Sequence, residues 1–429
     1  MRDGVVPHIV VAGGGFGGSY AVRELEKRLG RRARVTLVDR QNFFVFYPLL
    51  IEAGTGNLEP RHAVIPIRSF LDRGRFVLGA VTGLDPERRR LFYRPGGDDA
   101  ETGLDYDHLV IALGSVTRLP PVPGLDEHGF QIKSLAQAVG LRDRAIRMLE
   151  LAETAATEAA RRELLHFVVV GANFTGAELA GEFDVFLKEA SRSYRNVTPG
   201  DCRVTLVELA DRILGALEPE LAAYATRTMR ERGIDIRLGT SVDAIDPRHA
   251  DLSTGERLAS RTVIWCAGIA PAPALERLPL PKNDLGYLLC EPDLRVRGFE
   301  NLWGVGDIAV NPGPDGKAYP ATAQHAVRQG KAAARNIAAV LEGRPTRPHE
   351  FKDQGSIAAL GCRTGVAKVF GIRVSGFWAW FLFRTVYLLK MPGLGRKIRV
   401  ALDWSMDLFF RPDYVSLGVH RGRNGDDQP

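Results

Sequence analysis

Two short glycine-containing loops are the clearest candidates for chemistry in this sequence. The first places Gly13, Gly15 and Gly18 in the spacing GxGxxG, between the β-branched run "HIVV" and the helical stretch "SYAVRELEKRL". Such glycines allow a tight turn and let a pyrophosphate approach the backbone N–H groups at a helix start. A second strand-like run, "ARVTLVD", ends at Asp39, whose carboxylate can accept hydrogen bonds from a ribose. The combination predicts a dinucleotide-binding βαβ unit.

The same pattern recurs in the second third of the chain. Gly171, Asn173 and Gly176 form a loop between a strand-like run and a helical run, and "CRVTLVE" ends at Glu208. A carboxylate at that strand end favours an unphosphorylated ribose, hence NADH over NADPH. Asparagine tolerates unusual backbone angles, but the side chain of Asn173 is expected to crowd the pyrophosphate. The alternative is a Rossmann-like half that does not bind nucleotide.

Further strand ends lie between and after these units. "YDHLVIALGS" ends near Gly114, "VIWCAG" ends at Gly268, and "FENLWGVGDIA" ends in Gly306 and Asp307. Asp307 is placed to bind ribityl or pyrophosphate groups, although a strand ending in Gly-Asp is by itself typical of an ordinary turn.

The order of these motifs, "GxGxxG, ALGS, GxNxxGxE, CAG, GxGD", resembles the two-dinucleotide flavoprotein reductases over about the first 340 residues. The resemblance implies an α/β fold with two Rossmann-like, glutathione-reductase-like domains plus a C-terminal membrane-associating domain. It implies FAD in a discontinuous domain of residues 1–117 and 294–345, and NADH in residues 118–293, which include a helical linker. Residues 346–429 would form the third domain.

The resemblance assigns sixteen residues to cofactor binding, ten to FAD and six to NADH. They are Gly13, Gly15, Phe16, Gly18, Asp39, Arg40, Ala112, Gly114, Gly306 and Asp307 for FAD, and Gly171, Asn173, Gly176, Glu208, Ala267 and Gly268 for NADH.

A narrower resemblance rests on other segments. Reductases of disulfides carry a CxxxxC pair after the first unit, but "NFFVFYPLLIEAGTGNLEPRHAVIPIR" contains no cysteine. That segment, with "TGAELAGEF", "AQHAVRQG" and the aromatic tail, resembles type II NADH dehydrogenases, the single-subunit NADH:quinone oxidoreductases. The resemblance implies electron transfer from NADH through flavin to a membrane quinone, without proton pumping.

The candidate catalytic residues follow from this resemblance. Glu178 follows the second loop, where family members hold a glutamate near nicotinamide and flavin. Gln324 and position 328 lie on one helix face, and family members usually carry glutamine at both. Here Arg328 stands at the second position and Gln329 is its neighbour. His325 is a further candidate proton donor.

The tail carries an apolar anchor beside cations. "FWAWFLF" precedes Arg384, Lys390 and several later cations, and Trp378 and Trp380 suit the boundary between acyl chains and headgroups. We therefore expect a peripheral protein at an anionic membrane surface, on the cytoplasmic face of the cell membrane. An aromatic core segment or a homodimer interface is the alternative use of this tail.

Bulk properties are compatible with this prediction. The chain has 429 residues, 45% hydrophobic, with a net charge of +6, so several domains and an anionic partner are expected. The four scattered cysteines indicate neither a disulfide framework nor a metal site. The first residues leave no room for a signal peptide, no window reaches the length of a transmembrane helix, and no nucleic-acid motif is present.

Three other functions remain open from the sequence. A sulfide:quinone oxidoreductase shares flavin and quinone but needs paired cysteines. An NAD(P)H-dependent flavoprotein reductase of a soluble acceptor needs no aromatic, basic tail. A slow-turnover redox sensor would account for Asn173 and Arg328.

Overall fold

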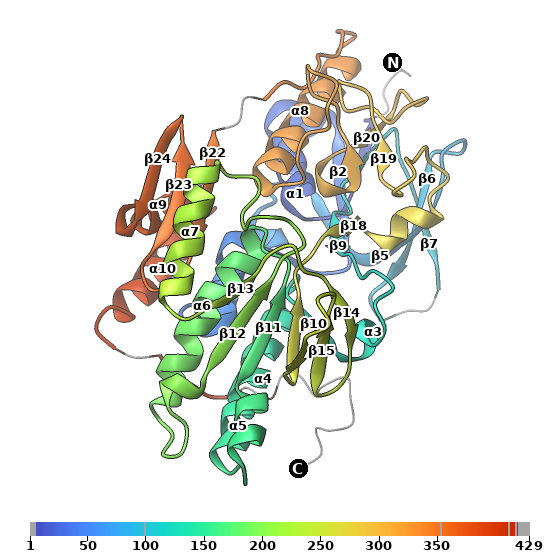
Figure 1. Cartoon of the computed structure of the whole chain (residues 1–429). Coiled ribbons are helices and arrows are strands. Elements are labelled where there is room, and N and C mark those ends of the chain that lie inside the picture. Colours follow the sequence, from blue (N-terminus) through green and yellow to red (C-terminus); the bar gives the residue numbers. More distant parts are fainter. Residues whose placement is uncertain (1–5, 98–99, 352–353, 411, 417, 419–429) are drawn as a thin grey trace. The chain divides into compact units, whose positions relative to one another are not determined.

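The structure is a computed structural model, and it describes residues 6–97, 100–351, 354–410, 412–416 and 418 (Figure 1). The chain divides into two compact units. The first comprises Met1–Val45, Val64–Val116 and Ile269–Asp353, and the second comprises Phe46–Ala63, Thr117–Gly268 and Gln354–Pro429. The domain boundaries expected from the sequence stay a prediction, and the end of the third predicted domain lies outside the described residues.

The first unit is built on a seven-stranded sheet in the order β20-β8-β1-β2-β5-β6-β7. Its parallel part runs from β20 to β5, and β6 and β7 add an antiparallel edge. The strands are β1 (His8–Ala12), β2 (Arg34–Asp39), β5 (Arg75–Asp85), β6 (Arg90–Pro95), β7 (Thr102–Asp105), β8 (His108–Ile111) and β20 (Leu302–Gly304). β1, β8 and β20 are adjacent and parallel, so the loops that follow them meet at one edge of the sheet.

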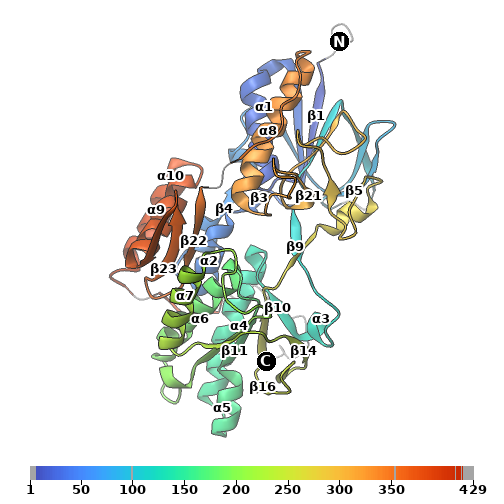
Figure 2. The same ribbon diagram turned by 45° about the horizontal axis from the view of Figure 1, so that its top comes forward.

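Helices α1 (Phe16–Leu29) and α8 (Ala323–Leu341) lie side by side in this unit (Figure 2). Glycines permit the close approach. A Cβ added to Gly330 would lie 2.1 Å from the carbonyl oxygen of Gly17, inside the backbone of α1. The helix that carries Gln324 and Arg328 is thereby fixed against the helix that follows the first glycine loop.

The second unit contains a parallel sheet in the order β10-β17-β11-β12-β13. The strands are β10 (Gly129–Gln131), β11 (His166–Val170), β12 (Arg203–Val207), β13 (Asp235–Arg237) and β17 (Thr262–Trp265). Around it lie α4 (Leu135–Glu153), α5 (Glu158–Leu164), α6 (Phe174–Ser191) and α7 (Pro219–Glu231), together with the antiparallel strands β14 (Val242–Ile245), β15 (His249–Leu252) and β16 (Arg257–Ala259). Both sheets agree with the α/β fold class predicted from the sequence.

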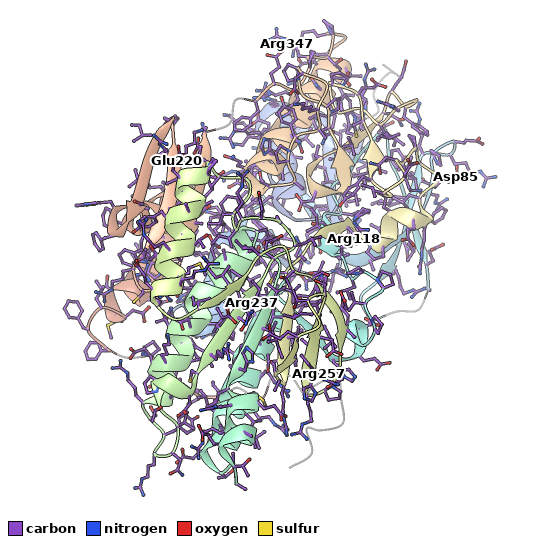
Figure 3. All side chains as sticks on the ribbon, viewed as in Figure 1. Asp85, Arg118, Glu220, Arg237, Arg257 and Arg347 are labelled. Atoms are coloured by element: carbon purple, nitrogen blue, oxygen red, sulfur yellow. The ribbon has the colours of Figure 1, made fainter. Side chains whose placement is uncertain are left out.

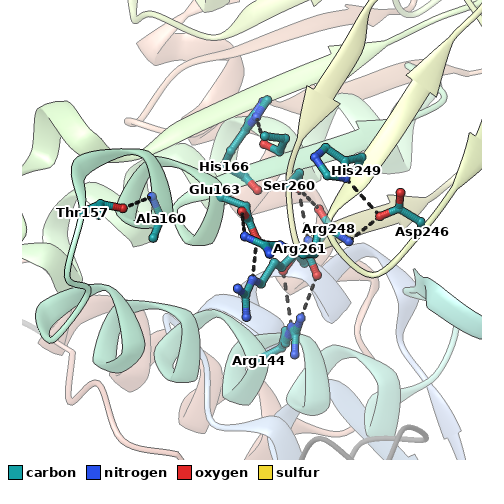
Figure 4. Close-up of polar contacts among 12 residues, drawn as sticks. Arg144, Thr157, Ala160, Glu163, His166, Asp246, Arg248, His249, Ser260 and Arg261 are labelled. Atoms are coloured by element: carbon teal, nitrogen blue, oxygen red, sulfur yellow. Dashed lines mark hydrogen bonds and ion pairs between the residues drawn. The ribbon is translucent and has the colours of Figure 1, made fainter.

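An ion-pair network holds α5 near the start of β11 (Figure 4). The Glu163 carboxylate accepts hydrogen bonds from Nε and Nη2 of Arg248 at 2.8 and 2.6 Å, and from Nε of Arg261 at 2.6 Å. Arg144 of α4 donates to the Arg261 carbonyl at 2.7 Å. The hydrogen bond from Arg248 is the main reason that the pKa of Glu163 is lowered. This network ties the end of α5 and helix α4 to Arg261, the residue that directly precedes β17.

The C-terminal part of the second unit is a small antiparallel sheet with two helices. They are β22 (Gly355–Ala359), β23 (Gly365–Val369), β24 (Ile372–Gly376), α9 (Phe377–Lys390) and α10 (Leu394–Met406). Arg232 ties this sheet to α6, because its guanidinium donates to the carbonyl oxygens of both Gly181 and Leu360. Among the described residues, no helix combines the length and apolar character that crossing a bilayer requires.

Candidate functional sites

The first glycine loop has the geometry of a phosphate-binding turn. Gly13 has φ +104°, and its added Cβ would lie 2.3 Å from the Ala112 carbonyl oxygen; that of Gly18 would lie 1.8 Å from the Gly13 carbonyl oxygen. An added Cβ at Gly15 meets no atom of the described residues within 4 Å. Two glycines are therefore required by the fold, and the third leaves open space at the start of α1, where a pyrophosphate fits.

Asp39 is locked to this loop. Its carboxylate accepts the N–H of Gly14 at 2.5 Å and the N–H of Gln41 at 2.8 Å. Burial raises the pKa of Asp39, and the two N–H donors oppose that rise. Of the other predicted residues nearby, Arg40 is exposed, and Phe16 contacts the Phe44 ring edge-on at 5.5 Å.

The loops after β8 and β20 come together at the same edge of the sheet. Ser115 donates a hydrogen bond from its hydroxyl to Asp307 at 2.8 Å, which joins the "ALGS" and "GD" motifs. Gly306 has φ +76°, and its N–H donates to the side-chain oxygen of Gln329 at 2.8 Å. Gln329 is buried and tethers α8 to the Gly306 loop. Its predicted role at the acceptor stays a prediction.

The second glycine loop repeats the first, with one change. Gly171 has φ +95°, and an added Cβ at Gly176 would lie 1.8 Å from the Gly171 carbonyl oxygen. Asn173 has φ −67° and ψ −173°, close to the −70° and −162° of Gly15, so its backbone needs no special tolerance. Its side chain accepts from the Gly176 N–H and donates to the Cys266 carbonyl. Asn173 is therefore the N-cap of α6.

Glu208 occupies the position that Asp39 has in the first unit. Its carboxylate accepts the N–H of Ala172 at 2.5 Å and the N–H of Ala210 at 2.9 Å. Arg237, labelled in Figure 3, ends the neighbouring strand, and its charge is balanced by Asp235 at 3.0 Å and Glu256 at 3.1 Å. The strand end nearest the second loop therefore presents the Glu208 carboxylate. Arg237, at the end of the neighbouring strand, is already paired with carboxylates.

Ala267 and Gly268 complete this edge of the second sheet. Ala267 lies against Gly171, because an added Cβ at Gly171 would be 2.7 Å from the Cα of Ala267. Gly268 has φ +75° and accepts the N–H of Arg118 at 3.3 Å. The structure thus brings all six predicted NADH residues to the carboxyl ends of β11, β12 and β17.

Glu178 lies on α6, is partly buried, and is near the buried carboxyl groups of Glu52 and Glu182. Its Oε1 accepts the N–H of Ala359 at 3.3 Å. Burial raises the pKa of Glu178 well above its usual range, and Glu182 and Glu52 raise it further. Burial also raises the pKa of Glu182 to about 7. Burial and the two neighbouring carboxyl groups therefore favour the protonated form of Glu178.

Two expectations for the tail are wrong. Trp380 is buried and does not lie at a surface, whereas Trp378 is 68% exposed. Arg384 is not a surface cation, because its guanidinium stacks between Trp380 at 4.5 Å and Trp404 at 4.8 Å. It also lies 3.8 Å from the Glu52 carboxylate, which accepts the Trp404 indole N–H at 2.6 Å. Trp380 and Arg384 belong to the packing between α9 and α10.

Sequence reasoning missed Glu52 and Glu182 as neighbours of Glu178. A lone carboxylate within the apolar run "PLLIEAG" and the i, i+4 spacing of Glu178 and Glu182 on one helix were the available signals. Neither signal says that the three carboxyl groups lie near one another, two of them buried, because that depends on how α2 (Leu50–Thr55) packs on α6.

Gln324 and Arg328 both lie in the first turns of α8, as expected. Each is partly exposed, and Arg328 donates from Nη1 to the Gln324 carbonyl oxygen at 2.9 Å. His325 is buried instead, with its Nδ1 at 2.8 Å from the Thr322 hydroxyl oxygen. The role of His325 as a proton donor stays a prediction.

The pyridine nucleotide-disulphide oxidoreductase family model matches residues 7–330, so the chain belongs to that family. The type II NADH:quinone oxidoreductase of Staphylococcus aureus is 29% identical over 400 residues, covering 90% of this chain and 96% of that protein. The demethylphylloquinone reductase of a Synechocystis strain is 30% identical over 411 residues, covering 93% of this chain and 95% of that protein.

A solved structure of NDH2 from Plasmodium falciparum in complex with NADH has a TM-score of 0.90 at 17% identity, covering 96% of this chain and 100% of that chain. That likeness shows a shared fold. Within its family the chain is an oxidoreductase of the type II NADH dehydrogenase group, which confirms the resemblance seen in the motifs.

Proposed function

We propose that the chain binds FAD in its first unit and NADH in its second, and that it reduces a membrane quinone at the expense of NADH without pumping protons. The observation that carries this proposal is a hydrogen bond found in both units, from an N–H of the glycine loop to a carboxylate at the end of the next strand. Asp39 holds Gly14 and Glu208 holds Ala172 at the same distance, 2.5 Å, each at the carboxyl edge of a parallel sheet. Two such sites support two dinucleotides.

The reaction balances with one proton from solvent. NADH supplies two electrons and one proton as hydride, and quinone takes up two electrons and two protons to become quinol. A bound flavin supplies the chemistry that links the two half-reactions. The chain's own residues position the dinucleotides through the two loops, and Glu178 holds a proton in the second unit. Gln324 is the proposed neutral hydrogen-bond donor to a quinone carbonyl.

Anaerobic mixing of the purified holoprotein tests the function. NADH should bleach the flavin absorbance, and a short-chain menaquinone or ubiquinone should restore it within the turnover time. Flavin that is bleached by sulfide and not by NADH would replace the proposal with sulfide:quinone chemistry. Rapid reoxidation by a ferredoxin alone would favour a soluble acceptor, and slow reoxidation by every acceptor would favour a sensor.

The choice of NADH over NADPH is assigned to Glu208. Replacing Glu208 with alanine removes the carboxylate that binds a ribose hydroxyl and repels a 2′-phosphate. We expect KM for NADH to rise about tenfold and the preference for NADH over NADPH to fall by more. Steady-state kinetics with both nucleotides measures this. Glu220→Gln, on the exposed side of α7, is the control (Figure 3). An unchanged preference in Glu208→Ala would contradict the assignment.

We further propose that α9, α10 and the residues after them bind an anionic membrane surface, at the cytoplasmic face. On α10 the side chains of Leu394, Ile398, Leu402 and Met406 recur every fourth residue, and each is more than half exposed. Phe377, Trp378 and Phe381 are exposed on α9. This apolar stripe lies among the cations Lys390, Arg396, Lys397 and Arg399, an arrangement that suits interfacial lipid binding. A homodimer through the same stripe is the competing outcome.

Charged substitutions in the stripe test the membrane proposal. The double change Ile398→Glu and Leu402→Glu should weaken binding to vesicles containing anionic lipid more than tenfold, because two exposed apolar anchors become anions. Cosedimentation with the vesicles measures it. Leu285→Glu changes a side chain of similar exposure in the first unit and should bind like the parent. Dissociation of a dimer by the double variant, with vesicle binding retained, would assign the stripe to dimerisation.

A further inference from the structure

The guanidinium of Arg328 is held in one place at the first turns of α8. Nη1 donates to the Gln324 carbonyl oxygen at 2.9 Å, one turn back along the helix. The guanidinium carbon also lies 4.0 Å from the centre of the Phe351 ring, a close cation–π distance. The side chain therefore folds back toward the helix N-terminus, as long helical side chains do, and brings its charge beside residue 324.

Phe351 is itself fixed by its neighbours. Its ring meets the ring of buried His325 edge-on at 5.0 Å, and its N–H donates to the Tyr319 hydroxyl at 3.1 Å. The Tyr319 hydroxyl donates to the His349 carbonyl oxygen at 3.3 Å. Phe351 is thus a platform anchored through both its backbone and its ring. Loss of the ring would leave the Arg328 side chain with more freedom.

The hydrogen bond to the Gln324 carbonyl oxygen brings the Arg328 guanidinium back toward the N-terminal end of α8. The N-terminus of a helix carries partial positive charge, which favours anions and disfavours cations. The first turn of α8 contains no acidic residue. Nearby cations also affect a neighbouring histidine. The pKa of His349 is lowered to about 4, chiefly by burial and further by His325, Arg335 and Arg328. The site concentrates positive potential at the end of the helix that holds Gln324.

We infer that Arg328, positioned by Phe351, recognises the negative charge that develops on the quinone as it is reduced. The inference rests on the proposed function. Two electrons and one proton convert a quinone into a quinol monoanion, and a second proton from solvent completes the quinol. An arginine stays protonated and gives up no proton, so its contribution is to stabilise that anion. Gln324, one turn earlier, supplies the neutral donor.

Binding of two naphthoquinones to the oxidised holoprotein tests this without turnover. The probes are 2-methyl-1,4-naphthoquinone, which is neutral, and 2-hydroxy-1,4-naphthoquinone, which is an anion at neutral pH, and calorimetry gives both dissociation constants. Arg328→Gln should weaken binding of the anion about tenfold and leave the neutral probe within about twofold. Phe351→Leu should also weaken binding of the anionic probe, by about three- to tenfold. Arg347→Gln removes an exposed cation that follows the same helix and should change neither dissociation constant.

Kinetics separates this inference from the proposed function. If the parent protein oxidises NADH with ferricyanide but not with quinone, the proposed function fails. If the parent reduces quinone, Arg328→Gln should lower kcat for quinone with little change in KM, most strongly at high pH, where the protons that would neutralise the anion are scarce. Equal or faster quinone turnover in Arg328→Gln, or anion binding unchanged in both variants, would overturn the inference.

Discussion

Replacing Gly15 with alanine is expected to leave the first unit folded but to remove its flavin. Gly15 has φ −70° and ψ −162°, which an alanine adopts readily, and within the part of the chain that the structure describes the added Cβ meets no atom closer than 4 Å. The new methyl group would instead occupy the approach of the pyrophosphate to the N-terminus of α1. We expect flavin occupancy of the purified protein to fall more than tenfold, measured as the ratio of absorbance near 450 nm to that near 280 nm.

Gly13→Ala is the matched control for a defect of folding. Gly13 requires φ +104°, and its Cβ would overlap the Ala112 carbonyl oxygen at 2.3 Å. That variant should lose thermal stability as well as flavin, whereas Gly15→Ala should lose flavin alone, with circular dichroism like that of the parent apoprotein. Full flavin occupancy in Gly15→Ala would show that no dinucleotide approaches this loop.

The glycine loops were predictable because their constraints are local. Gly13 and Gly18 lie five residues apart, and the turn that joins them requires glycine at both positions whatever the rest of the chain does. Asp39 and Glu208 were predictable for a related reason, since each ends the strand next to its loop and reaches a loop N–H. The spacing of the motifs was therefore enough to predict the fold class and the positions of both carboxylates beside their loops.

Contacts between distant segments were not predictable from such patterns. Asn173 departs from the glycine pattern of the second loop, but its side chain donates to the Cys266 carbonyl, 93 residues away. Gln329 is a candidate at the acceptor site from its place beside Arg328, and in the structure its side-chain oxygen accepts the Gly306 N–H. Trp380 has the sequence context of a membrane anchor, but it is buried, and Arg384 of α9 stacks between it and Trp404 of α10. Each of these partners is set by how elements pack, which one sequence does not state.

Two carboxyl groups on α6 lead to different predictions. Glu182 is predicted to affect stability, and Glu178 is predicted to affect catalysis. Burial raises the pKa of Glu182 from its ordinary value of 4.5 to about 7. The groups facing it are Glu52, Arg384, Arg232 and Asp407. The folded protein therefore keeps the Glu182 proton at a pH where the unfolded chain has lost it. The contribution of this group to stability is fully present below pH 4.5 and is lost as the pH rises through about 7.

Glu182→Gln should remove that pH dependence. Glutamine cannot ionise, and its amide oxygen can still accept from Asn57, which donates to Glu182 at 3.4 Å. At pH 8 the variant should be more stable than the parent by about 3 kcal/mol, whereas near pH 4 the two should be alike. Urea unfolding at both pH values measures the difference in the free energy of unfolding. A parent stability that does not fall between pH 4.5 and 8 relative to the variant would contradict the assignment.

Glu178→Gln makes the same isosteric change at the neighbouring carboxyl group and tests whether Glu178 takes part in catalysis. Its amide oxygen can keep the hydrogen bond from the Ala359 N–H. Because the proposed role of Glu178 requires it to hold and release a proton, we expect turnover with NADH and quinone to fall about a hundredfold.

Glu182→Gln should retain most of that turnover and serves as the control for loss of a buried carboxyl group on α6. Comparable losses in both variants would mean that the charge of the whole cluster matters and that Glu178 has no separate role. A loss confined to Glu178→Gln that is constant across pH 6 to 9 would instead favour orientation of the nicotinamide over proton transfer, because a positioning hydrogen bond does not titrate in that range.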